Sequence, residues 1–405
     1  MPGAVFIIRV EILCQATGSC PSPALQTQPS TCAMSVAVII PVYNGENHLR
    51  QTLDCVLAQT LRPDEIVVVD DGSTDSSPSI VEEYSGVQLL ESPGEGPNAA
   101  RNHGLRETGA AQVAFLDHDD VWHPQHLQRL SNSLEQEPGS PAAASGRGTF
   151  QDGEQPQFAA EARGCYLQDP WDRYPGNAMG EPLVALVRRD ALEEVGGWSP
   201  QHDGCGDFYL WLKLGLLGPF VVRESATAAR RLHDRSFASD LRKNDLLNYY
   251  GRHVDASHEA LRLRADKGLG TDAYHRRHQA EEAMLDLLGV LLGSEAGSLQ
   301  RAATKFDRSL SEASRDDLRP VWSTFQWYLR PYIQDVGARA FSSQIFRLTE
   351  RWPRPDSELR SMLREWSFRY TPTFDLISHH PLNALCWSHV LSRMCRRVRI
   401  YLYSR

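Results

Sequence analysis

The sequence has few cysteines, no excess of positive charge and no long apolar run. Its 405 residues include 8 cysteines, and no two have Cys-x-x-Cys spacing, which argues against a disulfide scaffold or a zinc knuckle. Lys and Arg number 42 against 51 Asp and Glu, a net charge of -9 that disfavours nucleic-acid binding. No stretch approaches the ~20 apolar residues of a membrane-spanning helix, and the first residues do not resemble a secretion signal. We therefore expect a cytoplasmic globular protein.

The pattern of the sequence divides the chain into three parts. Residues 1–34 are rich in Ser, Pro, Gln, Thr and Cys, which is typical of a disordered leader. Met34 stands directly before the first strand pattern, so we expect the native chain to start there. Residues 35–240 alternate between strand and helix patterns, and residues 241–405 carry helix patterns. We expect three matching domains: a leader, an α/β domain and a helical domain.

The middle part predicts an α/β fold. Strand patterns cover residues 36–40, 66–69, 87–90, 113–116 and 183–187, and helix patterns cover 46–60, 77–85, 98–108, 190–195 and 208–217. This alternation indicates a Rossmann-like, mainly parallel sheet with helices on both faces. Residues 135–177 are rich in Gly, Pro, Ala and Gln, and we expect long loops there. Further helices are predicted at residues 245–262, 274–292, 299–310 and 317–334.

Polar clusters follow three of the predicted strands. They are Pro41–Asn44, Asp70–Ser73 and Asp117–Asp120. Because the carboxyl ends of parallel strands meet at one edge of a sheet, we expect these clusters to lie together. Carboxylates gathered in one place repel each other unless a cation or a donor-rich ligand joins them. The sequence therefore predicts a binding site at this edge.

Four motifs occur in order along this part of the chain. They are Val-Ile-Ile-Pro-Val-Tyr-Asn at 38–44, Val-Asp-Asp-Gly-Ser-Thr-Asp at 69–75, Ala-Arg-Asn-His-Gly at 100–104 and Phe-Leu-Asp-His-Asp-Asp at 115–120. Together they resemble the successive signatures of family-two glycosyltransferases, with a weaker match at 196–198 and 207–233. The resemblance implies a GT-A fold, a nucleotide-diphosphate sugar as donor, and a divalent cation, Mn²⁺ or Mg²⁺. It implies an acceptor glycan, lipid-linked sugar or other hydroxyl compound, in cell-envelope or polysaccharide synthesis.

The family's Asp-any-Asp signature corresponds here to Asp117-His118-Asp119. By resemblance, Asp119 holds the metal, and Asp117 lies near the ribose and supports the metal. Divalent cations of this kind accept one or two carboxylates together with phosphate oxygens. On a continued strand, the side chains of Asp117 and Asp119 would point the same way. A simple capped turn is the alternative reading, and Asp120 fits a helix cap equally well.

The resemblance also assigns the nucleotide contacts. Pro41 and Tyr43 correspond to the loop that cradles the base, although Tyr43 also fits a half-buried aromatic residue at a strand end. Asp71 accepts the base's ring N–H, with a plain helix cap as the alternative. Arg101 is the cation nearest these motifs, and it can pair either with phosphate or with Asp70 or Asp117.

Transfer to a hydroxyl group also needs a base. In the family this is the Asp of a Glu-Asp pair that opens a helix, and here Asp207 keeps the Asp while Gly206 replaces the Glu. Asp207 as a mere N-cap is the alternative. In Arg231-Leu232-His233-Asp234, His233 corresponds to a histidine near the diphosphate or metal, or else it is structural. No second carboxylate nucleophile is evident, so the resemblance implies inversion at the anomeric carbon.

Other functions compete with this one. A nucleotidyltransferase would carry a glycine-rich basic loop after the first strand, whereas residues 41–46 hold one Gly and neither Lys nor Arg. A degenerate, non-catalytic scaffold is the second alternative, and the presence of Asp117, Asp119 and Asp207 argues against it. Residues 376–405 carry five Arg and no acidic residue, which fits a packed terminal helix or a peripheral contact with the inner face of the membrane.

Overall fold

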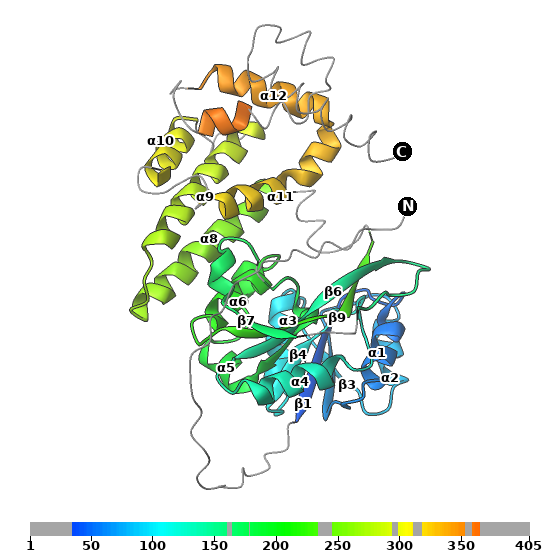
Figure 1. Cartoon of the computed structure of the whole chain (residues 1–405). Coiled ribbons are helices and arrows are strands. Elements are labelled where there is room, and N and C mark those ends of the chain that lie inside the picture. Colours follow the sequence, from blue (N-terminus) through cyan, green and yellow to red (C-terminus); the bar gives the residue numbers. More distant parts are fainter. Residues whose placement is uncertain are drawn as a thin grey trace, which may run out of the picture. The chain divides into compact units, whose positions relative to one another are not determined.

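The computed structural model describes residues 35–159, 164–177, 179–233, 245–293, 299–310, 318–352 and 359–364. The leader predicted at 1–34 and the Arg-rich segment 376–405 lie outside these ranges. Figure 1 shows a sheet with flanking helices, followed in sequence by a group of helices.

One sheet contains all nine strands of the described chain, and its main path runs β3-β2-β1-β4-β8-β6-β9-β5, with β7 on β9. The strands are β1 (Val36–Val42), β2 (Glu65–Asp70), β3 (Gln88–Glu91), β4 (Gln112–Phe115), β5 (Val121–Trp122), β6 (Ala142–Gln151), β7 (Cys165–Gln168), β8 (Ala185–Arg188) and β9 (Phe220–Leu232). The strands from β3 to β4 pair in parallel, as does β6 with β9, whereas β8 pairs antiparallel with both β4 and β6. β1 and β2 are apolar at nearly every position because both of their faces are buried under helices.

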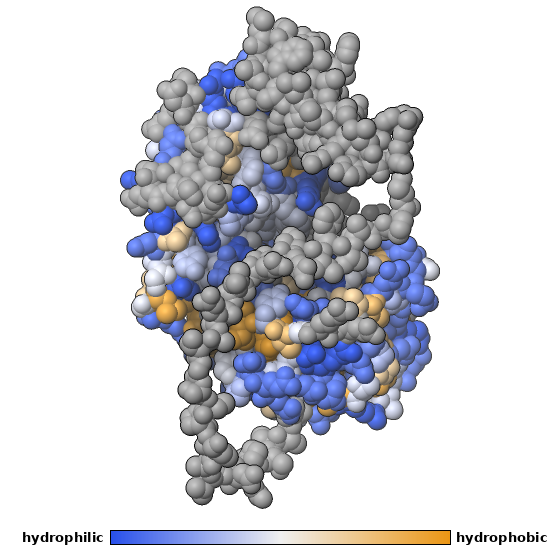
Figure 2. All heavy atoms as spheres, viewed as in Figure 1, coloured by the Kyte–Doolittle hydropathy of each residue, from blue (hydrophilic) through white to orange (hydrophobic). Residues whose placement is uncertain are grey.

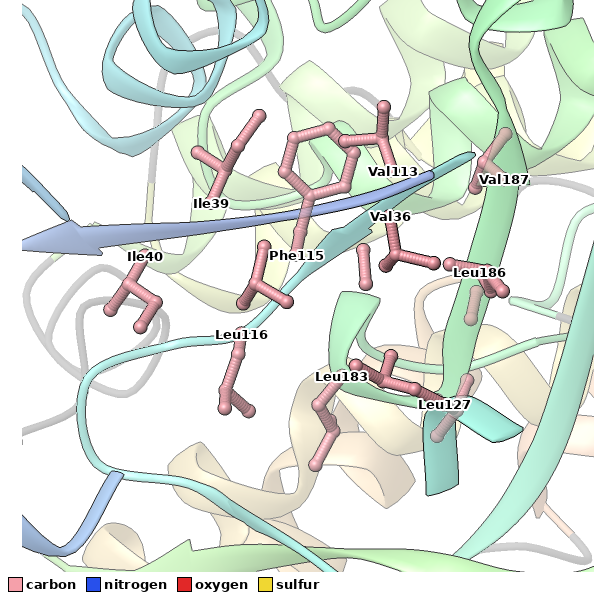
Figure 3. Packing of buried hydrophobic residues seen from close by; sticks show 14 of the residues in the cluster. Val36, Ile39, Ile40, Val113, Phe115, Leu116, Leu127, Leu183, Leu186 and Val187 are labelled. Carbon is pink, nitrogen blue, oxygen red and sulfur yellow. The ribbon is translucent and has the colours of Figure 1, made fainter. Parts of the chain in front are cut away.

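Helices cover both faces of the sheet, as predicted. Figure 3 shows Ile39 and Phe115 on one side of β1 and β4, and Ile40 and Leu127 on the other. α3 (Pro97–Arg106) packs closely on the first side, where a Cβ added to Gly104 would lie 2.6 Å from Ile39 Cγ2. α4 (His126–Gln136) covers the second side with Leu127. The remaining helices of this part are α1 (Leu49–Leu57), α2 (Ser77–Glu82), α5 (Arg189–Glu194) and α6 (Gly206–Leu214).

The prediction of long loops over 135–177 is wrong. This segment contains the ten-residue strand β6 and the short strand β7, and the end of α4 at Gln136 also enters it. β6 begins Ala-Ala-Ala-Ser-Gly, residues with low intrinsic strand preference. The strand forms because β8 and β9 lie on either side of it and supply its hydrogen-bond partners. The sequence pattern also did not predict β9, the longest of the described strands.

The predicted helical region is confirmed within the described residues. Its helices are α8 (Leu246–Asp266), α9 (Asp272–Leu291), α10 (Leu299–Leu310), α11 (Arg319–Val336) and α12 (Ala338–Glu350), the last of which we did not predict. They share a separate apolar core that includes Tyr250, Met284 and Phe325. No described helix has both the length and the apolar content needed to cross a membrane. Figure 2 shows mainly hydrophilic side chains on the visible described surface, with smaller hydrophobic areas.

A buried polar cluster joins the helical region to the α/β part. Glu281 on α9 has no exposed surface, and its carboxylate accepts hydrogen bonds from Tyr174 Oη and Ser257 Oγ, both at 3.1 Å. His253 Nε2 lies 3.4 Å and His278 Nδ1 3.5 Å from the same carboxylate. Burial alone raises the pKa of Glu281, but hydrogen bonds and positive charge from the two histidines outweigh it and lower the pKa. Glu281 is therefore a buried carboxylate held in its charged form.

Candidate active site

The three polar clusters lie at one edge of the sheet, as predicted. β1 pairs in parallel with both β2 and β4, so the carboxyl ends of these strands point to the same side. Tyr43 follows β1, Asp71 follows β2 and Asp117 follows β4 by two residues. Tyr43 is 59% exposed, while Pro41 is buried within β1, so Tyr43 is the one of the two with a ring free to meet a ligand.

The loop after β1 is fastened to the loop after β2. Asn44 has a positive φ of 52°, a conformation that asparagine tolerates better than most residues. Its side-chain oxygen accepts a hydrogen bond from Thr74 N at 2.8 Å, and its own N–H donates to Ser73 Oγ at 2.9 Å. Gly45 N donates to Ser77 Oγ at 2.8 Å. These bonds fix the backbone on which Tyr43 stands.

Asp71 is a buried carboxylate with one oxygen unsatisfied. Its Oδ2 accepts a hydrogen bond from Gly96 N at 2.9 Å, just before α3. Its Oδ1 is buried and has no hydrogen-bond partner among the described residues. Asp203 Oδ1 accepts from Asn98 N at 3.2 Å in the same first turn, and burial raises the pKa of Asp203 to about 6. The N-terminus of α3 is therefore occupied by two carboxylates, of which Asp203 was not foreseen.

Arg101 pairs with Asp117, which was one of the two partners expected for it. The distance from Nη2 to Oδ1 is 2.5 Å, and Nη1 donates to Asn98 Oδ1 at 2.9 Å. The guanidinium also lies over the ring of Trp198, 4.6 Å from its centroid. Arg101 is only 7% exposed, so it is held in place rather than free to reach outward.

Asp119 and His233 meet although 114 positions separate them. His233 Nε2 lies 2.6 Å from Asp119 Oδ2, and both side chains are less than one-fifth exposed. Burial alone raises the pKa of Asp119, but the His233 hydrogen bond and the positive charges of His118 and His233 lower it to about 2. The hydrogen bond to Asp119 in turn raises the pKa of His233 against the effect of burial. These are charge-complementary neighbours at the sheet edge.

Asp117 and Asp119 do not lie on a continued strand, contrary to expectation. β4 ends at Phe115, and a turn closed by Asp120 N and Asp117 O, 3.1 Å apart, follows it. The strand alternation that would align the two side chains is therefore absent, and each pairs with a different cation. Asp120 is not a helix cap either: it is buried, and its Oδ1 accepts from Arg231 N at 2.9 Å.

Arg231, for which the sequence predicted no separate role, connects several parts of this edge. Its Nε donates to Asp119 O at 2.9 Å, and its Nη1 donates to Asp152 Oδ1 at 2.7 Å. Its Nη2 lies 2.5 Å from Gln51 Oε1 on α1, and its guanidinium lies 4.5 Å from the ring centroid of Phe150. A buried arginine thus fixes the backbone of Asp119 to α1 and to the end of β6.

A metal here would depend on few protein ligands. Across the described ranges, no group of three or more His, Cys, Asp and Glu side chains is arranged to hold a metal ion. Asp119 and His233 nevertheless place a carboxylate and an imidazole side by side, with Asp117 two positions away in the sequence. This donor set fits a cation that completes its coordination with substrate phosphates and water.

Asp207 lies in the first turn of α6 and is held by its neighbours. Cys205 is the N-cap of that helix, so the alternative of Asp207 as N-cap is wrong. Asn177 Nδ2 donates to Asp207 Oδ2 at 2.9 Å, and Phe208 N donates to Asp207 Oδ1 at 2.8 Å. Burial and the charge of Glu181 raise the pKa of Asp207 to about 6, despite opposing contributions from these donors. A carboxylate with such a pKa suits general-base work near neutral pH.

Steric crowding explains why a glycine precedes Asp207. A Cβ at Gly206 would lie 2.1 Å from Asn98 Nδ2, so the Asn98 amide fills the space of a side chain. Asn98 uses this place to donate to Ser199 O at 2.9 Å and to accept from Arg101. In the sequence Gly206 is only a departure from the family pattern, because Asn98 lies 108 positions before it and its place beside Gly206 depends on the fold.

Glu181, whose charge acts on Asp207, and its two arginine partners were not predicted. Glu181 precedes the short 3-10 helix 182–184, and its Oε1 accepts from Arg147 Nη2 at 3.0 Å and Arg230 Nη1 at 2.7 Å. Arg147 is on β6 and Arg230 on β9, two strands that the sequence did not reveal. All three side chains are between one-fifth and one-third exposed. The failure to predict β6 and β9 therefore also hid this part of the site.

Comparison with known proteins agrees with the fold and the motifs. Glycosyltransferase GlyA of Streptococcus pneumoniae is 42% identical over 103 residues, which cover 24% of this chain and 15% of GlyA. Minor teichoic acid biosynthesis protein GgaA of Bacillus subtilis is 37% identical over 104 residues, 23% of each chain. An uncharacterized glycosyltransferase of Rickettsia felis is 26% identical over 212 residues, 49% of this chain and 34% of that one. The matches thus span about a third or less of these curated relatives.

The fold is also found among solved structures. The crystal structure of S. aureus TarS 1-349 in complex with UDP-GlcNAc aligns with a TM-score of 0.51 and 18% identity, covering 78% of this chain and 92% of that one. The GT-A fold expected from the motifs is thereby confirmed. Residues 37–196 match the model of glycosyl transferase family 2. The similarity to glycosyl transferase family 2 thus covers residues 37–196, which is less than half of the chain.

Proposed function

We propose that this chain transfers a sugar from a nucleotide diphosphate to a hydroxyl group of an acceptor. The observation that carries the proposal is the buried, unsatisfied Oδ1 of Asp71 at the sheet edge where Asp117 and Asp119 also lie. A buried carboxylate oxygen without a donor is costly, and a bound group that donates a hydrogen bond removes the cost.

The nucleotide is the natural donor of that hydrogen bond. Asp71 Oδ1 accepts the ring N–H of uracil, or the corresponding edge of guanine or thymine. Tyr43 offers its exposed ring to the base, on a loop fixed by Asn44. Asp117, oriented by Arg101, faces the ribose. Arg101 then contributes to binding mainly through Asp117, because it is buried and already paired.

Asp119 and His233 are the residues that would hold a divalent cation, with support from Asp117. An imidazole ligand favours Mn²⁺ over Mg²⁺, which takes oxygen ligands. Such a cation supplies Lewis-acid neutralisation of the diphosphate leaving group. Arg231 fixes the Asp119 backbone, so the carboxylate is preorganised for this role.

Asp207 acts as the base. Its carboxylate takes the proton of the acceptor hydroxyl while that oxygen bonds to the anomeric carbon of the sugar. The bond from the anomeric carbon to the diphosphate oxygen breaks, and the nucleoside diphosphate leaves with the electron pair. One displacement without a covalent enzyme intermediate inverts the anomeric configuration. The hydrogen bond from Asn177 Nδ2 holds one oxygen of the Asp207 carboxylate in place.

Two similarities favour particular substrates. TarS was crystallised with UDP-GlcNAc, which supports a UDP-linked sugar as donor. GgaA is named for minor teichoic acid biosynthesis, which supports an acceptor in cell-envelope polysaccharide synthesis. We therefore propose a UDP-sugar donor and a polysaccharide or lipid-linked acceptor.

Calorimetric titration with UDP and with GDP, each with and without Mn²⁺, tests the donor site. We expect Mn²⁺-dependent binding of UDP that Asp119→Ala abolishes and Asp207→Asn leaves unchanged. Hydrolysis of UDP-GlcNAc separates the alternatives, because glycosyl transfer to water yields UDP whereas nucleotidyl transfer yields UMP. Asp207→Asn should abolish UDP release. Binding without any UDP release by the wild-type chain would instead favour the non-catalytic scaffold.

A further inference from the structure

The helix that carries the base lacks an acidic neighbour at its start. Gly206 precedes Asp207 where the family carries a glutamate, and the Asn98 amide fills the space. No carboxylate can be added at position 206 while Asn98 stays in place. A negative charge beside the base can therefore come only from another part of the chain.

The segment before β8 brings a carboxylate to this place. Asn177 Nδ2 donates both to Asp207 Oδ2, at 2.9 Å, and to Gly180 O, at 3.2 Å. Trp211, one turn further along α6 than Asp207, donates from Nε1 to the same Gly180 O at 2.8 Å. α6 is thus connected to Gly180 twice, through Asn177 at Asp207 and directly at Trp211. Glu181 follows Gly180 in the sequence.

The Glu181 carboxylate is fixed by two cations. Arg230 Nη1 lies 2.7 Å and Arg147 Nη2 3.0 Å from Oε1, and Arg147 Nε lies 2.5 Å from Oε2. The arginines are on the neighbouring strands β6 and β9, where Arg230 is the register partner of Thr149. Two hydrogen bonds to Oε1 and one ion-pair contact at Oε2 leave the carboxylate little freedom. Its position relative to α6 is therefore set by the sheet.

We propose that Glu181 supplies, from outside α6, the carboxylate that is missing at position 206 and acts as the positioning residue of the base Asp207. This inference rests on the proposed role of Asp207 in sugar transfer. Glu181 places a negative charge near the base, while Arg147 and Arg230 hold the carboxylate in place. Asn177 connects the two parts by hydrogen bonds.

Charges on several elements act on Asp207. Glu181 raises its pKa, after the larger effect of burial, and Arg101 on α3 lowers it. Two neutral groups, the Cys205 thiol and the Tyr328 hydroxyl on α11, also feel the charge of Asp207. Since the base must be deprotonated, we expect the rate to fall as pH drops through about 6. Without the charge of Glu181, the pKa should be lower and the rate should persist to lower pH.

The first test measures the pKa of Asp207 directly. Carboxyl ¹³C NMR titration of aspartate-labelled protein, with Asp207→Asn to assign the signal, reports this pKa without any activity. We expect Glu181→Gln to lower it by roughly one unit, since a neighbouring like charge shifts a pKa by that order. Glu107→Gln, the same change at the exposed end of α3, should leave it unchanged. An unchanged pKa in Glu181→Gln would overturn the proposal.

The second test follows hydrolysis of UDP-GlcNAc against pH. Glu181→Gln should lower kcat roughly three- to tenfold on the high-pH plateau, because a weaker base transfers protons less well, and leave KM for UDP-GlcNAc unchanged. Glu181→Asp, which keeps the charge, should recover most of the rate. If Glu181→Gln shifts the NMR pKa of Asp207 but leaves the pH–rate profile unaltered, Asp207 is not the base. The effect of Glu181 on the pKa of Asp207 would still stand. Should Glu181→Gln not fold, Glu181→Ala must lower the Asp207 pKa in the same way, and an unchanged value would refute the proposal.

Discussion

At the scale of single residues, each carboxylate of the candidate site has a different partner. Asp117 pairs with Arg101, 16 positions away, and Asp119 with His233, 114 positions away. The types of these residues and their common edge could be predicted, because both follow from the ends of buried strands. Their partners could not, because ion pairs across such separations depend on the folded backbone. The turn after β4 likewise replaces the continued strand on which the side chains of Asp117 and Asp119 would have pointed the same way.

Asp71 offers the sharpest residue-scale prediction. Asp71→Asn keeps an oxygen for Gly96 N but presents an amide N–H to the base N–H, so both groups donate. Loss of a hydrogen bond to a charged group costs about 1.5–3 kcal/mol, which corresponds to a roughly 10- to 100-fold weaker Kd for UDP. Calorimetry measures this directly. Asp54→Asn, the same change on the exposed face of α1, should bind like wild type, and equal affinity of both variants would rule out base recognition by Asp71.

At the scale of elements, a strand or helix could be predicted only where its own sequence shows a hydrophobic pattern. The buried β-branched runs of β1 and β2 and the amphipathic helices have a period that local sequence reveals. β6 and β9 do not: β6 opens with small residues, and β9 interleaves Arg and Ala. They form because each lies beside a partner strand, with the register shifting near Gly146. Tertiary pairing, rather than propensity, decided these two elements.

The contact between α3 and β1 predicts a specific sensitivity. Gly104→Ala would place a methyl group 2.6 Å from Ile39 Cγ2 and 3.2 Å from Val69 Cγ2, so the helix must shift. Overpacking of this kind costs about 1–3 kcal/mol of unfolding free energy. Gly109→Ala is the matched control, because its nearest neighbour would be Glu65 Oε1 at 3.9 Å. Urea unfolding of both variants decides the matter, and equal stabilities would contradict the packing described.

At the scale of the whole molecule, the α/β part and the helical region share buried polar contacts. Tyr174, beside the α/β core, donates to Glu281 of α9, and Arg277 Nη1 donates to Tyr174 O at 3.0 Å. The sequence predicted helices here but no function for them. Helix periodicity predicts which face of a helix is apolar and buried. It does not predict that a glutamate such as Glu281 is buried among histidines, because in the sequence it looks like a surface residue. The division into domains near residue 240 stays a prediction.

Glu281 should be important for stability and make it depend on pH. Glu281→Gln weakens several charge-assisted hydrogen bonds, and we expect a loss of about 1–3 kcal/mol at pH 7. Because folding lowers the pKa of Glu281, its contribution is full above the unfolded pKa and is lost as pH falls below it. Urea unfolding from about pH 5 down to about pH 3 should therefore show a flatter decline for Glu281→Gln. Glu282→Gln, half-exposed on the same helix, serves as control, and the same loss in both would exclude a special role.

The Asn98 amide in the space beside Gly206 also constrains how this chain can change over time. A substitution that restores glutamate at position 206 alone meets Asn98 and disturbs Arg101, so it is harmful in this background. The same substitution becomes tolerable only after Asn98 has become smaller, and useful only after Glu181 has been lost. The three positions are therefore epistatic: the order of mutations decides which ones selection accepts. Homologues should carry these residues as linked sets rather than as free combinations.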